Sequence, residues 1–279
     1  MISNISKKMS ELAEKKNISE IVKSLVGFSK HHLFAPVINP VYRKIISPKI
    51  EINVGKYSCN FYSSTCSLFK SDFRDTIRSE IRVIKDFLSE VRREDCFFDI
   101  GAHHGVYSCF LGRVIDPNSE KIVPFEPHPK SYRILVKNLQ LNNLLKYAKV
   151  KNCALSDVNK SSFLISEGEG SRIEKTVDST GFKIELRKGD SLVIQNDVPP
   201  PDIIKIDVEG HELRVLRGLQ KTLQNHCRLI YCELHPSLLD NYEDNPNSVV
   251  RFLKRRDFRM RRLQKRDDQI HLKFKRSNL

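Results

Sequence analysis

The chain has 279 residues, of which 39% are hydrophobic and 29% charged, with a formal net charge of +14. This length can bury a substantial core, and the composition excludes a disordered or membrane-embedded protein. The basic excess lies at the two ends, since residues 1–56 carry ten basic and four acidic side chains and residues 251–279 carry twelve and three, so the charge does not by itself indicate a nucleic-acid-binding protein.

The apolar runs and the cysteines indicate the cellular compartment in which the protein is expected. It contains no run of eighteen apolar residues, and the N-terminal stretch lacks the apolar core of a secretory signal. The seven cysteines are odd in number and form no C-x2-C pair, which favours reduced, buried thiols. We therefore expect a cytoplasmic protein, with peripheral association at an anionic membrane through the basic ends as an alternative.

Residues 1–76 are predicted to form an N-terminal basic helical segment and a short hairpin. Apolar residues recur at helical spacing among lysines over 1–34, prolines follow, and 50–70 is typical of a hairpin.

A second domain over 77–279 is predicted from alternating strands and helices. Its predicted strands are 96–100, 121–127, 146–155, 202–208 and 227–234, its predicted helices are 77–91, 105–114, 131–141, 211–224 and 247–256, short strands occupy 160–190, and a hairpin ends the chain. This alternation predicts a doubly wound, mostly parallel α/β sheet.

The first motif, FFDIGAHHG at 97–105, joins a buried strand to a helix. Glycine lets the backbone approach a ligand closely, and the helix N-terminus offers free N–H groups. Ala102 and His103 displace the second glycine of a G-x-G-x-x-G pattern, which disfavours a nicotinamide-dependent dehydrogenase. Asp99 would repel phosphates but accept hydrogen bonds from an ammonium group. A tight turn without a ligand is the alternative interpretation.

Two further segments follow the next strands. Glu126 ends the second strand, where a carboxylate can accept two hydrogen bonds from a ribose diol. The segment NCALSD at 152–157 brings small and polar residues to the end of the third predicted strand, where they suit the edge of an adenine slot or an ordinary strand end.

Ionisable residues crowd the ends of the fourth and fifth strands. Lys205, Asp207 and Glu209 share one strand face, because side chains alternate with a period of two. A buried lysine beside carboxylates indicates either paired charges or a site, with a structural ion pair and helix cap as the alternative. Glu233 and His235 share one face at the same sheet edge.

Together, FFDIGAHHG, PFEPHP, NCALSD, IIKIDVEGHE and LIYCELHP resemble the FkbM family of class I S-adenosylmethionine-dependent methyltransferases, over about residues 77–275. The resemblance implies a Rossmann-like, seven-stranded sheet with helices on both faces. It also implies S-adenosylmethionine as the cofactor, and its expected binding residues are Asp99, Gly101, Ala102, His103, Gly105, Glu126, Pro127, Ala154, Leu155 and Asp207. The pair His103-His104 departs from the family pattern.

The implied activity is O-methylation of a hydroxyl on a glycan, glycolipid or small metabolite. An alcohol acceptor must lose its proton during attack, so a histidine or carboxylate should lie within reach. The expected catalytic residues are His235, His211, Glu209, Glu233 and Lys205, with Glu212 as a further orienting group. No metal is assigned, although a divalent ion held by Asp207, Glu209 and Glu233 is an alternative.

Two other functions are consistent with the same chain. An RNA methyltransferase would use the basic ends, and a non-catalytic scaffold would retain the fold without the cofactor. The basic tail offers few aromatic residues for stacking on bases, so we expect a small-molecule or glycan acceptor and no specific nucleic acid. The terminal hairpin and the helix before it are predicted to form one basic face.

Overall fold

The computed structural model describes residues 49–62, 73–117, 120–167, 170–174 and 181–277. Contacts divide the chain into two units, one of residues 51–61 with 71–279 and the other of residues 1–50 with 62–70. The predicted N-terminal helix and the proline-containing linker lie outside the described residues. The boundary near residue 76 stays a prediction.

The hairpin predicted over 50–70 is confirmed for its described part. Strand β1 (Lys49–Val54) pairs with β2 (Tyr57–Tyr62), and Gly55 turns between them with a φ of 60°. Two hydrogen bonds join Asn60 to the side chain of Asn142, one from the Asn60 backbone N–H at 2.9 Å and one to its carbonyl at 2.7 Å. Most of the hairpin thus belongs to the same unit as the main sheet.

The main sheet has the strand order β11-β12-β10-β9-β3-β4. Its strands are β3 (Phe97–Ile100), β4 (Ile122–Phe125), β9 (Ile203–Ile206), β10 (Leu229–Leu234), β11 (Phe258–Arg266) and β12 (Gln269–Arg276). The four central strands pair in parallel, and β12 runs antiparallel to both β10 and β11. The seven-stranded sheet is not confirmed in full, because the chain beyond β4 adds only two isolated bridges, at Ala148 and Lys151.

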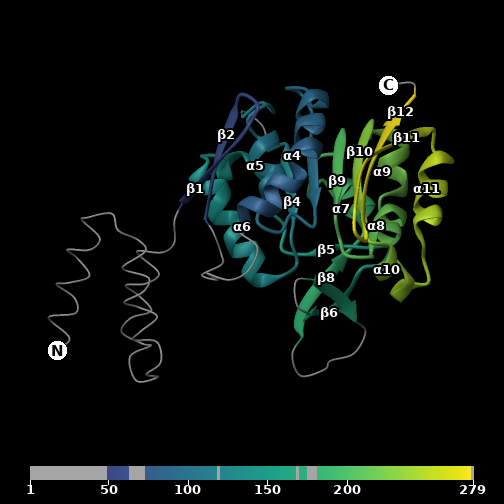
Figure 1. The fold of residues 1–279 in the computed structure, drawn as a ribbon. Coiled ribbons are helices and arrows are strands. Elements are labelled where there is room, and N and C mark those ends of the chain that lie inside the picture. Colours follow the sequence, from purple (N-terminus) through teal and green to yellow (C-terminus); the bar gives the residue numbers. More distant parts are fainter. Residues whose placement is uncertain (1–48, 63–72, 118–119, 168–169, 175–180, 278–279) are drawn as a thin grey trace, which may run out of the picture. The chain divides into compact units, whose positions relative to one another are not determined.

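Helices cover both faces of this sheet, as Figure 1 shows. On one side lie α4 (Phe73–Glu90), α5 (Val106–Leu111) and α6 (Pro129–Leu141), and on the other lie α8 (Glu212–Gly218), α9 (Gln220–Asn225) and α11 (Pro246–Lys254). The remaining helices are η2 (Leu145–Tyr147), α7 (Gly189–Ile194), α10 (Pro236–Leu239) and η3 (Asp240–Tyr242). Among the described residues, none of the helices has the length and apolarity to cross a membrane.

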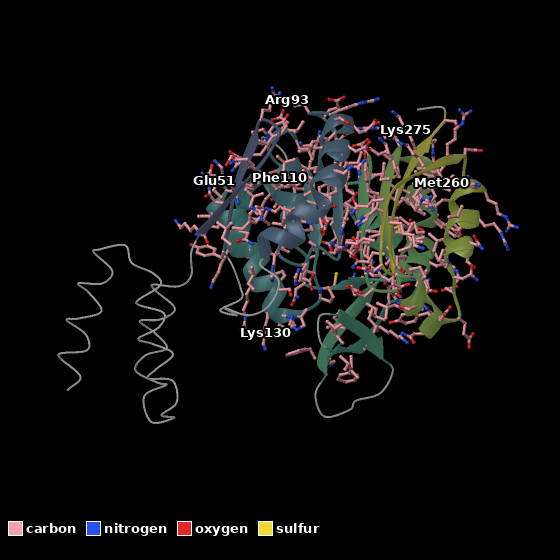
Figure 2. All side chains as sticks on the ribbon, in the orientation of Figure 1. Glu51, Arg93, Phe110, Lys130, Met260 and Lys275 are labelled. Atoms are coloured by element: carbon pink, nitrogen blue, oxygen red, sulfur yellow. The ribbon has the colours of Figure 1, made fainter. Side chains whose placement is uncertain are left out.

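The core lies between the sheet and these helices because the central strands are apolar along their whole length. Every residue of β3, β4, β9 and β10 is buried, as expected for parallel strands covered on both faces. The rings of Phe98 and Phe125 meet edge to face across β3 and β4 at 5.1 Å. Figure 2 shows the contrast between the fully buried Phe110 and Met260 on the outer strand β11, which is 39% exposed.

A second sheet has the order β5-β8-β6-β7, formed by β5 (Ala154–Leu155), β6 (Lys160–Glu167), β7 (Gly170–Glu174) and β8 (Phe182–Arg187). The short strands predicted over 160–190 are therefore confirmed. The single strand predicted over 146–155 is wrong, because the chain leaves the main sheet after Lys151 and enters β5. The Asn152 side chain marks the departure, since its amide donates to the Glu126 carbonyl at 2.7 Å.

The helical stretch predicted over 211–224 is confirmed, but it is divided into α8 and α9 at Leu219. The Asp190 carboxylate accepts hydrogen bonds from the backbone N–H groups of Lys221 at 2.9 Å and Thr222 at 2.8 Å. A carboxylate in this place stabilises the start of a new helix because it satisfies N–H groups that have no partner within the helix.

The direction of the chain determines where a ligand can bind. From β3 the chain proceeds outward to β4, and it later returns to β9 on the other side of β3. Ligands of doubly wound sheets bind beyond the carboxyl ends of the strands at such a reversal. Asp99 of β3 pairs in register with Lys205 of β9, so the polar residues that follow these strands meet at one edge.

Candidate functional site

A tight turn follows β3 and lies against the loop after β9. Gly101 and Gly105 both have a φ of 77°, a left-handed conformation that suits glycine. The N–H groups of Gly101 and Ala102 donate to the Phe125 carbonyl at 3.0 Å, which fixes the turn onto β4. A Cβ on Gly101 would lie 1.8 Å from the backbone oxygen of Asp207, so glycine is required there.

Asp99 lies beneath this turn with one oxygen held and the other free. Its Oδ2 accepts hydrogen bonds from the N–H of Ser108 at 3.0 Å and from the Ser108 hydroxyl at 2.6 Å. Its Oδ1 is buried and has no hydrogen-bond partner among the described residues. Burial raises the pKa of Asp99, although Lys205 opposes that shift. A buried acceptor without a donor is costly unless a ligand supplies one.

Glu126 lies at the end of β4 and joins two backbone segments. Its Oε2 accepts from the N–H of His103 at 2.7 Å, and its Oε1 accepts from the N–H of His128 at 2.8 Å. Burial raises the pKa of Glu126 to about 7, although both hydrogen bonds lower it. Each carboxylate oxygen keeps a further lone pair that can accept from a hydroxyl group.

Four carboxylates surround the imidazole of His235 at the ends of β9 and β10. Its Nδ1 lies 3.3 Å from Glu212 Oε1, within hydrogen-bond reach. Its Nε2 lies 3.6 Å from Glu209 Oε2, 3.8 Å from Glu233 Oε1 and 3.9 Å from Asp207 Oδ1. The structure therefore brings together four of the residues expected at the site, together with the orienting Glu212.

The charges in this cluster depend strongly on one another. Burial alone would lower the pKa of His235, but the Glu212 hydrogen bond and the charges of Asp207 and Glu209 raise it to about 9. Burial and the nearby Asp207 raise the pKa of Glu233 to about 8. The imidazole is therefore cationic at neutral pH when no other cation is present, and it balances the surrounding acids.

Lys205 holds Asp207 in place. Its Nζ lies 2.6 Å from Asp207 Oδ2 and 4.7 Å from the centre of the Tyr107 ring. Burial would lower the pKa of Lys205, but Asp207, Glu233 and Glu80 outweigh it and raise that pKa. The same ammonium keeps the pKa of Asp207 low despite burial. Lys205 is therefore a positioning cation and a poor proton acceptor.

Sequence reasoning missed three residues that border the cluster. Tyr107 of α5 donates its hydroxyl to Glu80 of α4 at 2.8 Å, and both lie near Lys205. His271 of β12 is the cross-strand partner of Glu233, with its Nδ1 3.6 Å from Glu233 Oε2. The alternation in the terminal hairpin was a signal for His271, but the sequence did not identify the strand that the hairpin joins.

The structure places His211 apart from the carboxylates around His235. Its Nε2 lies 3.0 Å from the Ser156 hydroxyl oxygen, and its ring meets Tyr242 edge to face. Burial lowers the pKa of His211 to about 4, so the ring is neutral. Ala154 and Leu155 are buried in β5 beside Leu186, and their expected role at an adenine stays a prediction.

The sheet and its acids define a class of protein. Antiparallel β12 lies between β10 and β11, Asp99 lies within β3, and carboxylates follow β4 and β9 at the edge where strand order reverses. This arrangement is that of a Rossmann-like class I methyltransferase, whose cofactor is S-adenosylmethionine. A family model described as the methyltransferase FkbM domain matches residues 99–260, and the chain belongs to this family.

Characterised relatives are also methyltransferases. The chain is 27% identical over 179 residues to the hexuronic acid methyltransferase AglP of Haloferax volcanii, covering 63% of this chain and 69% of that protein. It is 28% identical over 156 residues to the methyltransferase sdnD of Sordaria araneosa, covering 44% and 60%. A crystal structure of a methyltransferase FkbM from Methylobacillus flagellatus aligns with a TM-score of 0.48 and 19% identity, covering 68% of this chain and 46% of that one.

The residues at the sheet edge fit S-adenosylmethionine. Glu126 presents buried carboxylate oxygens that suit the hydroxyls of a ribose, and Asp99 holds a buried oxygen without a donor. Gly101 keeps the turn free of side-chain atoms. Asp207, ionised beside Lys205, suits an ammonium group. Acidic acceptors are the complement of a ligand that carries hydroxyl and cationic groups.

Proposed function

We propose that the protein is an S-adenosylmethionine-dependent O-methyltransferase that acts on a hydroxyl of an acidic sugar, in a glycan, glycolipid or small metabolite. The observation that carries this proposal is the convergence of carboxylate and imidazole atoms around His235, beside Asp99 and Glu126. One part of the edge suits the methyl donor, and the adjoining part suits a hydroxyl that must lose a proton.

Different residues of the chain orient the methyl donor and accept the proton. S-adenosylmethionine, when bound, supplies an electrophilic methyl group. Glu126 and Asp99 orient the donor, and Lys205 holds Asp207 at the boundary between donor and acceptor. The cluster around His235 accepts the proton of the acceptor hydroxyl, and Glu209 is its most open carboxylate, with 32% of its side chain exposed. A base within hydrogen-bond reach accelerates such transfers by about 10²–10⁴-fold.

Two observations favour an acidic acceptor. AglP, by its name, methylates a hexuronic acid. On this chain, a groove of ≈ 580 Å³ between α8, α11 and the end of β12 is rich in guanidinium groups and has one acidic lining residue, Asp257. The arginines that line it are Arg217, Arg251, Arg255, Arg256 and Arg276. Guanidinium groups match carboxylates and phosphates in shape and charge.

Calorimetry with S-adenosylmethionine tests the donor site. We expect the wild type to bind and Glu126→Ala to bind about 10–100-fold more weakly, because charge-assisted hydrogen bonds to the donor are lost. Glu94→Gln removes an exposed carboxylate and serves as the control. Folded wild-type protein that does not bind, or Glu126→Ala that binds equally well, would contradict the proposal.

Labelled methyl transfer tests the acceptor. Oligosaccharides that contain uronic acids should accept label, and neutral oligosaccharides of the same length should accept less. Alkaline hydrolysis separates the products, since a methyl ester on the carboxylate is cleaved and a methyl ether on a hydroxyl survives. Label that is lost on hydrolysis would show methylation at the carboxylate and refute the assignment to a hydroxyl.

A further inference from the structure

We propose that Asp207, Glu233 and His235 form a binding site for one divalent cation of the Mn²⁺ or Mg²⁺ kind. The sequence assigned no metal and left Asp207, Glu209 and Glu233 as an alternative ligand set. The structure points to a different set, because His235 lies between the carboxylates and Glu209 lies at its outer side.

The separations between the three ligand atoms fit a shared ion. One ligand atom from each of Asp207, Glu233 and His235 lies within 4.8 Å of the other two, and His235 Nε2 is 3.8 Å from Glu233 Oε1 and 3.9 Å from Asp207 Oδ1. Metal–ligand bonds of about 2.1 Å place two ligands roughly 3.0 Å apart at a right angle and about 4.2 Å apart across the ion. The separations of 3.8 Å and 3.9 Å fall between these two limits, and the bound of 4.8 Å exceeds the larger limit by about 0.6 Å, so the ligand atoms would have to move closer by up to about that amount to share one ion.

Two of the three ligands are oriented by a second residue that binds their other polar atom. Lys205 Nζ lies 2.6 Å from Asp207 Oδ2, and Glu212 Oε1 lies 3.3 Å from His235 Nδ1. Beside the third ligand, His271 Nδ1 lies 3.6 Å from Glu233 Oε2, which is too far for a hydrogen bond. A carboxylate on the far nitrogen of an imidazole is the usual support of a metal-bound histidine, because it fixes the ring and its tautomer. The atoms that remain are Asp207 Oδ1, Glu233 Oε1 and His235 Nε2, and both oxygens lie within 3.9 Å of that nitrogen.

The Nε2 nitrogen of His235 lacks a hydrogen-bond partner among the described residues. The side chain is only 5% exposed, and within the described residues its Nε2 forms no hydrogen bond, since the three nearest carboxylate oxygens lie 3.6–3.9 Å away. These distances are too long for hydrogen bonds. An ion at the centre would satisfy the nitrogen and both carboxylates at once.

The charge of the pocket also favours a cation. Four carboxylates lie within 3.9 Å of His235, and Lys205 is the one ammonium that pairs with any of them among the described residues. An acidic acceptor would add further negative charge. A divalent ion would take the place of the proton that His235 carries in its absence and would bring a larger positive charge to these carboxylates. A hydroxyl that reaches the ion would lose its proton more readily, with Glu209 beside it to accept that proton. The inference thus deepens the proposed function, on which the role of the ion in the reaction rests.

Binding of Mn²⁺ by the full chain tests the site without any acceptor or methyl donor. Chelator-treated protein is titrated with MnCl₂, and free Mn²⁺ is followed by electron paramagnetic resonance. We expect one ion per chain in the wild type. Asp207→Asn, Glu233→Gln and His235→Gln should each weaken binding by about 10–100-fold or more, since each removes one ligand. Circular dichroism checks that every variant is folded.

The matched control is Glu94→Gln, which removes an exposed carboxylate away from the site and should bind Mn²⁺ as the wild type does. Glu212→Gln should weaken binding less than Glu212→Ala, because the amide oxygen still accepts from His235 Nδ1. No binding by folded wild type, or unchanged binding in all three ligand variants, would overturn the inference. Mn²⁺ binding without S-adenosylmethionine binding would instead refute the proposed function and leave the ion site standing.

Discussion

Glu126 should make the stability of the protein fall as the pH rises from 5 to 8. Burial raises the pKa of this carboxyl from 4.5 to about 7 in the folded chain. The folded state therefore holds the proton more tightly than the unfolded state. The stabilisation is fully present below the unfolded pKa, it decreases as the pH rises towards the folded pKa, and it is absent above that value.

The size of the effect follows from the two pKa values. A shift from 4.5 to about 7 corresponds to roughly 3 kcal/mol in total, of which about 2.5 kcal/mol is lost between pH 5 and pH 8. Glu126→Gln removes the titration and keeps the shape. The amide nitrogen then faces one of the two N–H donors from His103 and His128, which costs about 1–2 kcal/mol at every pH. The free energy of unfolding of the wild type minus that of the variant should therefore fall by about 2 kcal/mol from pH 5 to pH 8.

Urea unfolding followed by circular dichroism measures this difference, without S-adenosylmethionine and at constant ionic strength. The subtraction removes the other titrating groups that both proteins share. Glu94→Gln, at an exposed glutamate, should differ from the wild type by the same small amount at every pH. A difference for Glu126→Gln that stays constant or grows with pH would refute the assignment of a raised pKa to a buried Glu126.

Two further substitutions test the framework of the site. Asp95→Asn removes a buried carboxylate that the Arg228 guanidinium contacts at 3.2 Å and 2.5 Å. We expect this substitution to lower the free energy of unfolding by about 3–5 kcal/mol. The control Asp240→Asn, at an exposed residue, should lower it by less than about 0.5 kcal/mol. Gly101→Ala places a Cβ 1.8 Å from a backbone oxygen, so we expect lower stability in urea and weaker S-adenosylmethionine binding by calorimetry. Gly55→Ala has a similar φ but open space around it, and it should cost only about 1–2 kcal/mol with donor binding unchanged.

The order of elements was predictable because local patterns determine it. Buried runs such as FFDI and LIYCEL form strands, and helices with one apolar face alternate with them. The strand that was predicted wrongly over 146–155 and the break between α8 and α9 both have distant causes. The Asn152 amide bonds to the Glu126 carbonyl where the chain leaves the main sheet, and Asp190 provides the start of α9. Hydrogen bonds between distant residues leave no periodic signal in a sequence.

The site, like the fold, was predictable only where a local pattern determines it. Asp207, Glu233 and His235 were predictable because parallel strands bring their carboxyl ends to one edge. His211 lies further along the same loop after β9, and its ring contacts Ser156 and Tyr242. The sequence cannot separate these outcomes, because one residue of displacement after a strand turns a side chain towards a different neighbour.

The Arg276 end of the arginine-lined groove lies well away from the acidic cluster, and this separation predicts a dependence on acceptor length. Arg276 N–H bonds to the Arg228 carbonyl at one end of β10, and His235 follows the other end, roughly 20 Å away along an extended strand. A short acidic acceptor cannot span that distance, whereas a long one can.

The double variant Arg251→Gln/Arg255→Gln changes two exposed groove residues and should raise KM about two- to tenfold for long acidic oligosaccharides only. Added salt should reduce the same preference, because it screens exposed charges. An equal rise in KM for short and long acceptors would show that the groove does not bind the acceptor chain.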